Sequence, residues 1–180
     1  MTRARHGVGV LALVALATAC SAATTTSVAN YQGTYSLWLV GGTNGCALAG
    51  VAEGQSISKI PFVVIQDTAS GIPQNMTATL GGSAGMLMGS LVGTNLLVGT
   101  LGGSQVTLTP GPIDAGKPPS GMKGNCMFTT SVVVSLNFGG DTVQGTIVYA
   151  DNTNGASECG TLRSCQTVLA VAGVLTPGDS

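Results

Sequence analysis

The sequence predicts an all-β fold, an antiparallel up-and-down barrel of about eight strands, with a two-sheet β-sandwich as the alternative. Apolar and polar residues alternate over short runs, and clusters of Gly, Asn and Asp separate these runs. Charged residues make up only 7% of the chain, while glycine, threonine and other β-branched residues are abundant. Short connections favour a meander, and eight strands close most economically into a barrel because closure leaves no exposed edge.

Eight runs of this kind are expected to form strands. They cover residues 33–40, 56–66, 74–80, 94–101, 104–109, 126–138, 142–150 and 166–175. Pro61 lies inside the second run and predicts an edge, a bulge or a strand start. Gly102 and Gly103 predict a two-residue hairpin turn. The apolar run Val132–Val134 predicts a strand buried on both faces or placed centrally. Residues 110–124, rich in proline and glycine, predict a long loop.

The stretch 81–93 leaves more than one structure open. Its glycines recur at every fourth position, at Gly81, Gly85, Gly89 and Gly93. On a helix they would form one stripe of small residues, and on a strand they would share one face. Because glycine is a poor helix former, we expect a bent strand or loop packed against the core. A short helix covering a barrel end and insertion into a membrane are the alternatives.

The first nineteen residues have the organisation of an export signal. Arg3 and Arg5 precede an apolar run over 8–17, and small residues follow up to Ala19. The run is shorter than the roughly 20 apolar residues that span a bilayer. We therefore predict a signal peptide over 1–19, a flexible tether over 20–30 and a single β-barrel-like domain over 31–176. Cleavage would also remove His6, the only histidine of the chain.

The end of this signal resembles the lipobox of bacterial lipoprotein precursors. Cys20 follows Thr18 and Ala19, although Ala17 occupies the position where the family prefers leucine. The resemblance implies a diacylglyceryl thioether on Cys20 and attachment to the membrane through acyl chains. Ser21, in place of aspartate, resembles the lipoproteins that Gram-negative bacteria sort to the outer membrane. Ordinary signal peptidase cleavage after Ala19, giving a secreted soluble protein, is the alternative.

The number of cysteines supports lipidation of Cys20. The chain has five cysteines, and an odd thiol in an exported protein needs an explanation. Lipidation leaves Cys46, Cys126, Cys159 and Cys165, which can close two disulfides in three possible pairings. The short spacing favours Cys159–Cys165, leaving Cys46–Cys126 as the second bridge. These spacings match no zinc pattern, so we predict no metal site and no cofactor.

Charge argues against nucleic acid as a partner. After signal removal the chain keeps four basic side chains and seven acidic ones, a net charge of −3. Phosphate binding needs clustered Lys and Arg, and no such cluster is present. An envelope protein or a small apolar molecule is the expected partner, in addition to the membrane that holds the acyl chains.

Two patterns resemble functional sites, a catalytic serine and a calcium site, but each lacks part of the residues that such a site needs. Ser83 lies in a G-x-S-x-G pattern, which in a nucleophile elbow requires a histidine base, and the mature chain has none. Asp151, Asn152, Asn154 and Glu158 offer calcium-like oxygens without the spacing of an EF-hand. We therefore predict no catalytic residue and a non-enzymatic role.

The aromatic residues suggest one alternative function. Gly33-Thr34-Tyr35 and Trp38 resemble the G-x-W start of lipocalins, with the Trp displaced. The resemblance implies a small apolar ligand in a barrel lumen lined by Tyr35, Trp38 or Phe128. The leading hypothesis is a lipid-anchored, disulfide-bonded β-domain of the cell envelope with a structural or interaction role. Lipocalin-like ligand binding is its alternative.

Overall fold

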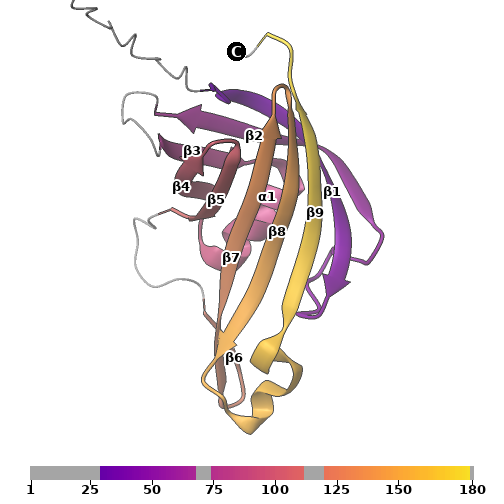
Figure 1. Ribbon diagram of the computed structural model, residues 1–180. Helices are drawn as coiled ribbons and strands as arrows, with labels where there is room; N and C mark the ends of the chain where they lie inside the picture. The colour runs from indigo at the N-terminus through magenta and orange to yellow at the C-terminus, as the bar shows by residue number, and fades with distance from the viewer. Residues whose placement is uncertain (1–28, 68–73, 112–119, 179–180) are drawn as a thin grey trace, which may run out of the picture.

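A computed structural model describes residues 29–67, 74–111 and 120–178, which form a closed antiparallel β-barrel (Figure 1). The eight barrel strands are β1 (Gly33–Asn44), β2 (Ser56–Gln66), β3 (Gln74–Leu80), β4 (Leu96–Gly102), β5 (Gln105–Pro110), β7 (Cys126–Gly139), β8 (Thr142–Thr153) and β9 (Gln166–Leu175). Neighbouring strands follow chain order, and β1 pairs with β9. Strand β5 pairs directly with β7, although β6 lies between them in the sequence. The predicted eight-strand up-and-down barrel is confirmed.

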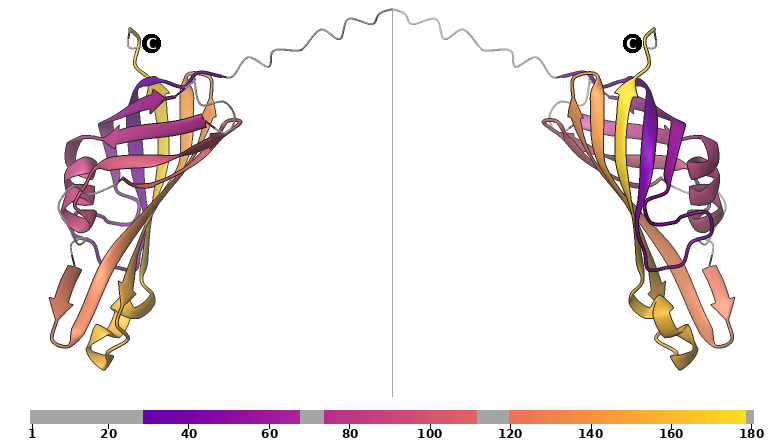
Figure 2. Two further views of the ribbon diagram at one scale, coloured as in Figure 1. Left: turned by 90° about the vertical axis from the view of Figure 1, so that its left-hand side faces the viewer. Right: turned by 90° about the vertical axis from the view of Figure 1, so that its right-hand side faces the viewer.

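The two ends of the barrel differ. We call the end that carries the chain's C-terminus the upper end and the opposite one the lower end (Figure 1). At the lower end β7 and β8 project beyond the other strands, together with β6 (Ser120–Lys123) and the 3-10 segment η1 (Ser157–Ser164) (Figure 2). Strand β6 lies inside the stretch expected to be a loop over 110–124, and it forms because residues 120–123 pair with the first residues of β7.

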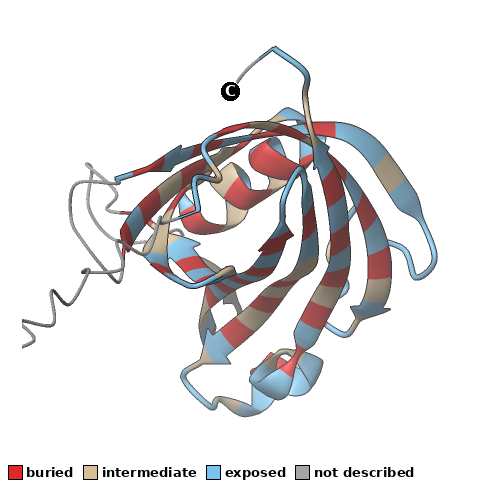
Figure 3. Ribbon diagram, turned by 45° about the horizontal axis from the view of Figure 1, so that its top comes forward, coloured by how far each residue is buried: buried red, intermediate tan, exposed pale blue. Residues whose placement is uncertain are grey.

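The barrel interior is filled by side chains. Exposure alternates along the strands, so that every second residue contributes to one continuous apolar core (Figure 3). At the upper end Tyr31 stacks on the Phe138 ring and Tyr35 meets the same ring edge to face. The Gln66 side chain also forms hydrogen bonds to the backbone of residues 29 and 31 there. The core therefore continues to the upper end of the barrel.

Residues 81–93 form a helix, α1 (Gly82–Val92), and the expected bent strand is wrong. The helix contacts β2, β3 and β7, and Met88 on its inner face is 0% exposed. Gly81 precedes the helix without a side-chain cap, and Gly93 ends it in the left-handed conformation, where glycine has no steric penalty. The structure matches the alternative prediction, a short helix that covers one end of the barrel, because α1 packs on the core at the lower end.

Pro61 lies where β2 loses one of its neighbours. The β2–β3 ladder begins at Phe62, so the missing N–H of Pro61 falls just outside it. Two residues earlier, Lys59 adopts φ 60°, and the β1–β2 register shifts between Leu37 and Leu39. This is a β-bulge opposite Trp38, and it confirms the prediction of an edge or a bulge at this point.

The predicted signal peptide, Cys20 and most of the tether lie outside the described residues. Among the helices that the structure describes, none combines the length and the apolar character needed to cross a membrane.

Candidate functional site

Two disulfides fasten the lower end of the barrel. Cys46 pairs with Cys165, and Cys126 pairs with Cys159. The four cysteines are bonded as predicted, but the expected pairing of Cys159 with its near neighbour is wrong. The reason is topological, because β1 lies beside β9 and β7 lies beside β8. The first bridge thus joins the ends of β1 and β9, and the second joins the start of β7 to the segment η1 that follows β8. The two bridges indicate an oxidising, extracytoplasmic environment.

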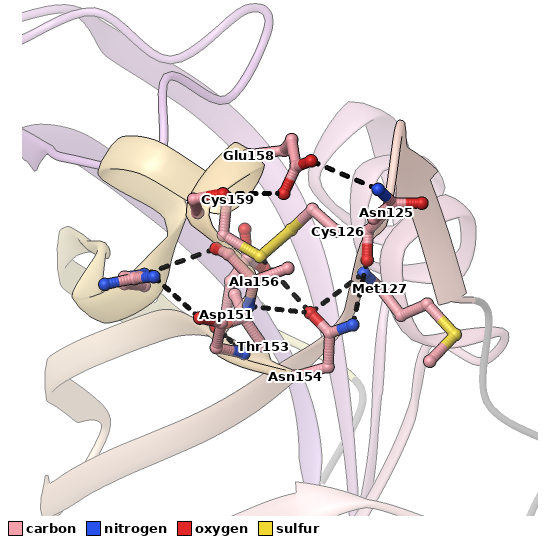
Figure 4. Close-up of a disulfide and its surroundings, with 12 residues drawn as sticks. Asn125, Cys126, Met127, Asp151, Thr153, Asn154, Ala156, Glu158 and Cys159 are labelled. Carbon is pink, nitrogen blue, oxygen red and sulfur yellow. Dashed lines mark hydrogen bonds between the residues drawn. A yellow bond between two sulfur atoms is a disulfide. The ribbon is translucent and has the colours of Figure 1, made fainter.

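Hydrogen-bonded side chains surround the Cys126–Cys159 bridge (Figure 4). The Asn154 side chain accepts from the backbone N–H groups of Met127 and Ala156, and it donates to the carbonyl of Asn125 over 2.9 Å. The Asn125 amide donates to the Glu158 carboxylate. The pKa of Glu158 is lowered by a hydrogen bond to its own backbone and by the side chains of Ser157 and Asn125. These contacts hold the projecting extension together.

The Cys46–Cys165 bridge lies next to a buried carboxylate. Asp151 accepts a hydrogen bond of 2.6 Å from the Thr130 hydroxyl, and its other oxygen is 3.4 Å from the Cys165 sulfur. The two sulfurs and a carboxylate oxygen of Cys46, Asp151 and Cys165 all lie within 4.8 Å of one another. Because both sulfurs are in the disulfide, only the carboxylate is available to a cation.

The oxygen-rich stretch considered for calcium does not converge on one point. Asp151 faces inward to Thr130, whereas Asn152 is exposed and bonds Ser131. Asn154 and Glu158 use their oxygens in the hydrogen bonds described above. The residues therefore have structural partners in the extension.

Ser83 lies exposed in the first turn of α1. The segment β3–Gly81–α1 has the strand–turn–helix order of a nucleophile elbow. However, the described part of the chain contains no histidine, since His6 lies outside it. The arrangement provides a serine hydroxyl without the base that would activate it.

The three residues expected to line a lumen lie apart. Tyr35 is buried in the core, and its hydroxyl donates to the Tyr31 carbonyl over 3.1 Å. Trp38 is 42% exposed, because it lies on the opposite face of β1 from Tyr35. Phe128 packs its ring against Gly121 in the projecting extension. The expectation that Trp38 and Phe128 line a lumen is therefore wrong. Side chains of the apolar core fill the interior of the barrel.

An open groove of about 660 Å³ lies on the outer face of the barrel. Six polar side chains line it: Gln105, Thr107, Ser135, Asn137, Gln144 and Thr146. They come from β5, β7 and β8, and all are exposed except the half-buried Thr146. None of the six carries a charge.

The strand register arranges these side chains in two rows. Gln105, Asn137 and Gln144 face one another across β5, β7 and β8, and so do Thr107, Ser135 and Thr146. Between the rows lie the inward-facing residues Val106, Leu136, Gly145 and Val171, which also line the groove. The groove therefore runs across the strands, with a polar row along each side. The groove was not predicted from the sequence, although the alternation that places Thr, Ser, Asn and Gln outward is visible there.

No protein-family model, curated protein or solved structure matches this chain. The function is therefore inferred from the residues themselves. Two features bear on it, the disulfide-bonded lower end and the groove of the outer face.

Proposed function

We propose that this protein is an exported, lipid-anchored domain of the cell envelope with a non-enzymatic, interaction role. The acyl chains on Cys20 hold it to the membrane, in a Gram-negative host to the outer membrane. The tether of residues 20–30 connects this anchor to β1, whose first residue is Gly33. The barrel then acts as a rigid body that presents its outer face to envelope components.

The observation that supports this proposal most strongly is the pairing of the cysteines. All four cysteines of the described chain are in disulfides, which leaves Cys20 as the one cysteine without a disulfide partner among them. A free thiol in an oxidising compartment is reactive and prone to form intermolecular bridges. A thioether to a diacylglyceryl group removes that thiol. The unpaired Cys20 therefore supports the lipoprotein hypothesis over plain secretion.

The packed interior supports an interaction role over ligand transport in a lumen. A lipocalin-like carrier needs an internal cavity for its ligand. Here Phe62, Met76 and Leu108 are each 1% exposed or less inside the barrel, and α1 adds Met88 to the same core. Binding through the outer face requires no rearrangement of this core.

Fractionation of cells that express variants at the anchor tests this proposal. We expect Cys20→Ser to move the protein from the membrane to the soluble fraction, whereas Ser21→Ala remains with the membrane. In a Gram-negative host, Ser21→Asp is expected to shift the protein to the inner membrane. Membrane association of Cys20→Ser equal to that of the parent would overturn the lipid anchor.

The non-enzymatic role has a separate test. A screen of ester, peptide and glycoside substrates is expected to show no turnover by the purified protein. Turnover that is lost in Ser83→Ala or in variants of the acidic residues would overturn this part of the proposal.

A further inference from the structure

The outer groove has the chemistry of a site for uncharged, hydroxyl-rich ligands. Amide side chains both donate and accept hydrogen bonds, and so do hydroxyl groups. Gln105, Asn137 and Gln144 supply three amides, and the facing row supplies three hydroxyls. A sugar presents many hydroxyl groups that need partners of both kinds, so the two rows match its hydrogen-bonding pattern.

Two of these amides have no competing partner. Asn137 accepts a hydrogen bond of 2.7 Å from the Ser104 hydroxyl, which fixes its orientation. The side-chain amides of Gln105 and Gln144 have no hydrogen-bond partner within the described residues. They lie in the same row as Asn137, one on each side of it. The groove thus combines one fixed amide with two that are available to a ligand.

The charge of the surroundings excludes most other ligand classes. Among the nine described strands, the charged residues are Lys59, Lys123 and Asp151, and none of them lines the groove. Asp141, in the turn between β7 and β8 three residues before Gln144, does not line it either. An anionic ligand would need Lys or Arg, and a cationic ligand would need Asp or Glu. A typical protein interface would place exposed aromatic or aliphatic side chains at its centre, whereas the exposed side chains here are amides and hydroxyls.

The register extends the amide row beyond the groove, but the groove ends before the exposed tryptophan. Beyond Gln144, the row passes to Ala172 on β9 and then to Trp38 on β1, and neither residue lines the groove. Trp38 is four strands away from Gln105 in the closed eight-strand barrel, so the two side chains lie on opposite sides of it. The contacts available to one ligand are therefore those of the two rows on β5, β7 and β8.

We propose that this groove binds a neutral oligosaccharide, which lies across β5, β7 and β8. The ligand forms hydrogen bonds to the two rows. This inference names the partner class of the envelope domain, and in that respect it rests on the proposed function. The groove itself does not depend on the anchor, so the two proposals fail in different experiments.

Titration of the purified full-length protein with neutral glycans tests the inference. The probes are cellohexaose, maltohexaose and hexa-N-acetylchitohexaose, with polygalacturonate as the charged comparison. Trp38, the only tryptophan of the chain, lies outside the groove, so binding is measured by calorimetry. We expect saturable binding of at least one neutral hexasaccharide and weaker binding of the matching disaccharide.

Variants then locate the site by calorimetry. The double variant Gln105→Ala/Gln144→Ala is expected to bind about tenfold or more weakly, since each lost hydrogen bond weakens binding severalfold. Trp38→Ala is expected to bind the hexasaccharide as tightly as the parent, because Trp38 lies outside the groove. Asn152→Ala is the matched control, because Asn152 is an exposed amide on the same strand outside the groove. Circular dichroism verifies that each variant is folded.

Four results would overturn the inference. They are no binding of any neutral hexasaccharide, equal binding by the double variant and the parent, preference for polygalacturonate, and binding to phosphatidylcholine or phosphatidylglycerol vesicles that the groove variants abolish. Release of Cys20→Ser from the membrane is measured separately, so a failed glycan titration leaves the lipid anchor intact.

Discussion

Cys46 and Cys165 join the end of β1 to the start of β9, with their Cα atoms 4.8 Å apart across a sequence separation of 119. These two strands form the seam at which the first and last strands of the barrel meet. The bridge therefore fixes the closure of the whole barrel, whereas Cys126–Cys159 spans 33 residues and fixes the projecting extension.

This difference predicts unequal effects of removing the two bridges. In the chain-entropy model, the longer bridge stabilises the fold by about 5 kcal/mol and the shorter by about 4 kcal/mol. We expect Cys46→Ala/Cys165→Ala to lower the free energy of unfolding more than Cys126→Ala/Cys159→Ala. Urea denaturation of the two double variants measures the difference. A larger loss in the second variant would contradict the role of the seam.

Two glycines on α1 are expected to respond oppositely to alanine. At Gly85 an added Cβ would meet the Leu80 carbonyl oxygen, a contact that backbone atoms cannot relieve. At Gly89 nothing lies within 4 Å of the added Cβ. We expect Gly89→Ala to stabilise by about 0.5–1 kcal/mol and Gly85→Ala to destabilise by about 1–3 kcal/mol. Thermal unfolding of both measures this, and equal shifts would contradict the packing of α1.

Two buried tyrosines make stability sensitive to alkali. Burial raises the pKa of Tyr149 from 10.0 to about 12, and the pKa of Tyr35 rises to about 12 through burial and then the charge of Asp141. Because the unfolded chain loses these protons first, their contribution is complete below pH 10 and is lost as the pH rises toward 12. We expect Tyr149→Phe to flatten the decline of the urea midpoint between pH 10 and 12. An unchanged decline would contradict this assignment.

The same two tyrosines differ at neutral pH. The Tyr35 hydroxyl donates to the Tyr31 carbonyl, whereas the Tyr149 hydroxyl has no partner among the described residues. Tyr35→Phe is therefore expected to destabilise by about 1 kcal/mol, and Tyr149→Phe is not expected to destabilise at all. Chemical denaturation at pH 7 compares them. A greater loss in Tyr149→Phe would show that its hydroxyl has a partner.

Asn154 is expected to be the key side chain of the projecting extension. Two of its hydrogen bonds to backbone groups join it to Asn125 and Met127, the residues on either side of Cys126, and a third is accepted from Ala156. Asn154→Ala should cost about 1–3 kcal/mol and raise amide hydrogen exchange at Met127, because the bonds are partly exposed to water. Asn152→Ala, which removes one long side-chain contact, serves as the control. Unaltered exchange at Met127 would contradict this role.

The barrel strands could be predicted from the sequence because alternation and turn residues act locally. Each predicted run overlaps one barrel strand, and the alternation of Tyr35 with Trp38 already places them on opposite faces of β1. For that reason the two could not both have lined a lumen. Closure of the barrel also brings Cys46 beside Cys165, so this bridge follows from the predicted fold. The prediction of a Cys159–Cys165 bridge relied instead on the short distance between those two cysteines in the sequence.

The helix and the extension could not be predicted because tertiary contacts determine them. Glycine propensity opposes a helix over 82–92, and α1 forms because Ala84, Met88 and Val92 complete the core. Strand β6 depends on Gly121, whose missing side chain gives room for the Phe128 ring. The groove likewise depends on the register of strands that are distant in sequence.

Mass spectrometry of the protein taken from its host membrane examines the anchor and both bridges in one experiment. We expect a chain that begins at Cys20, carries the mass of acyl chains on its N-terminal peptide, and lacks the hydrogens of two disulfides. Peptides from the unreduced digest should link Cys46 with Cys165 and Cys126 with Cys159. An unmodified Cys20, or a bridge between Cys159 and Cys165, would contradict this expectation.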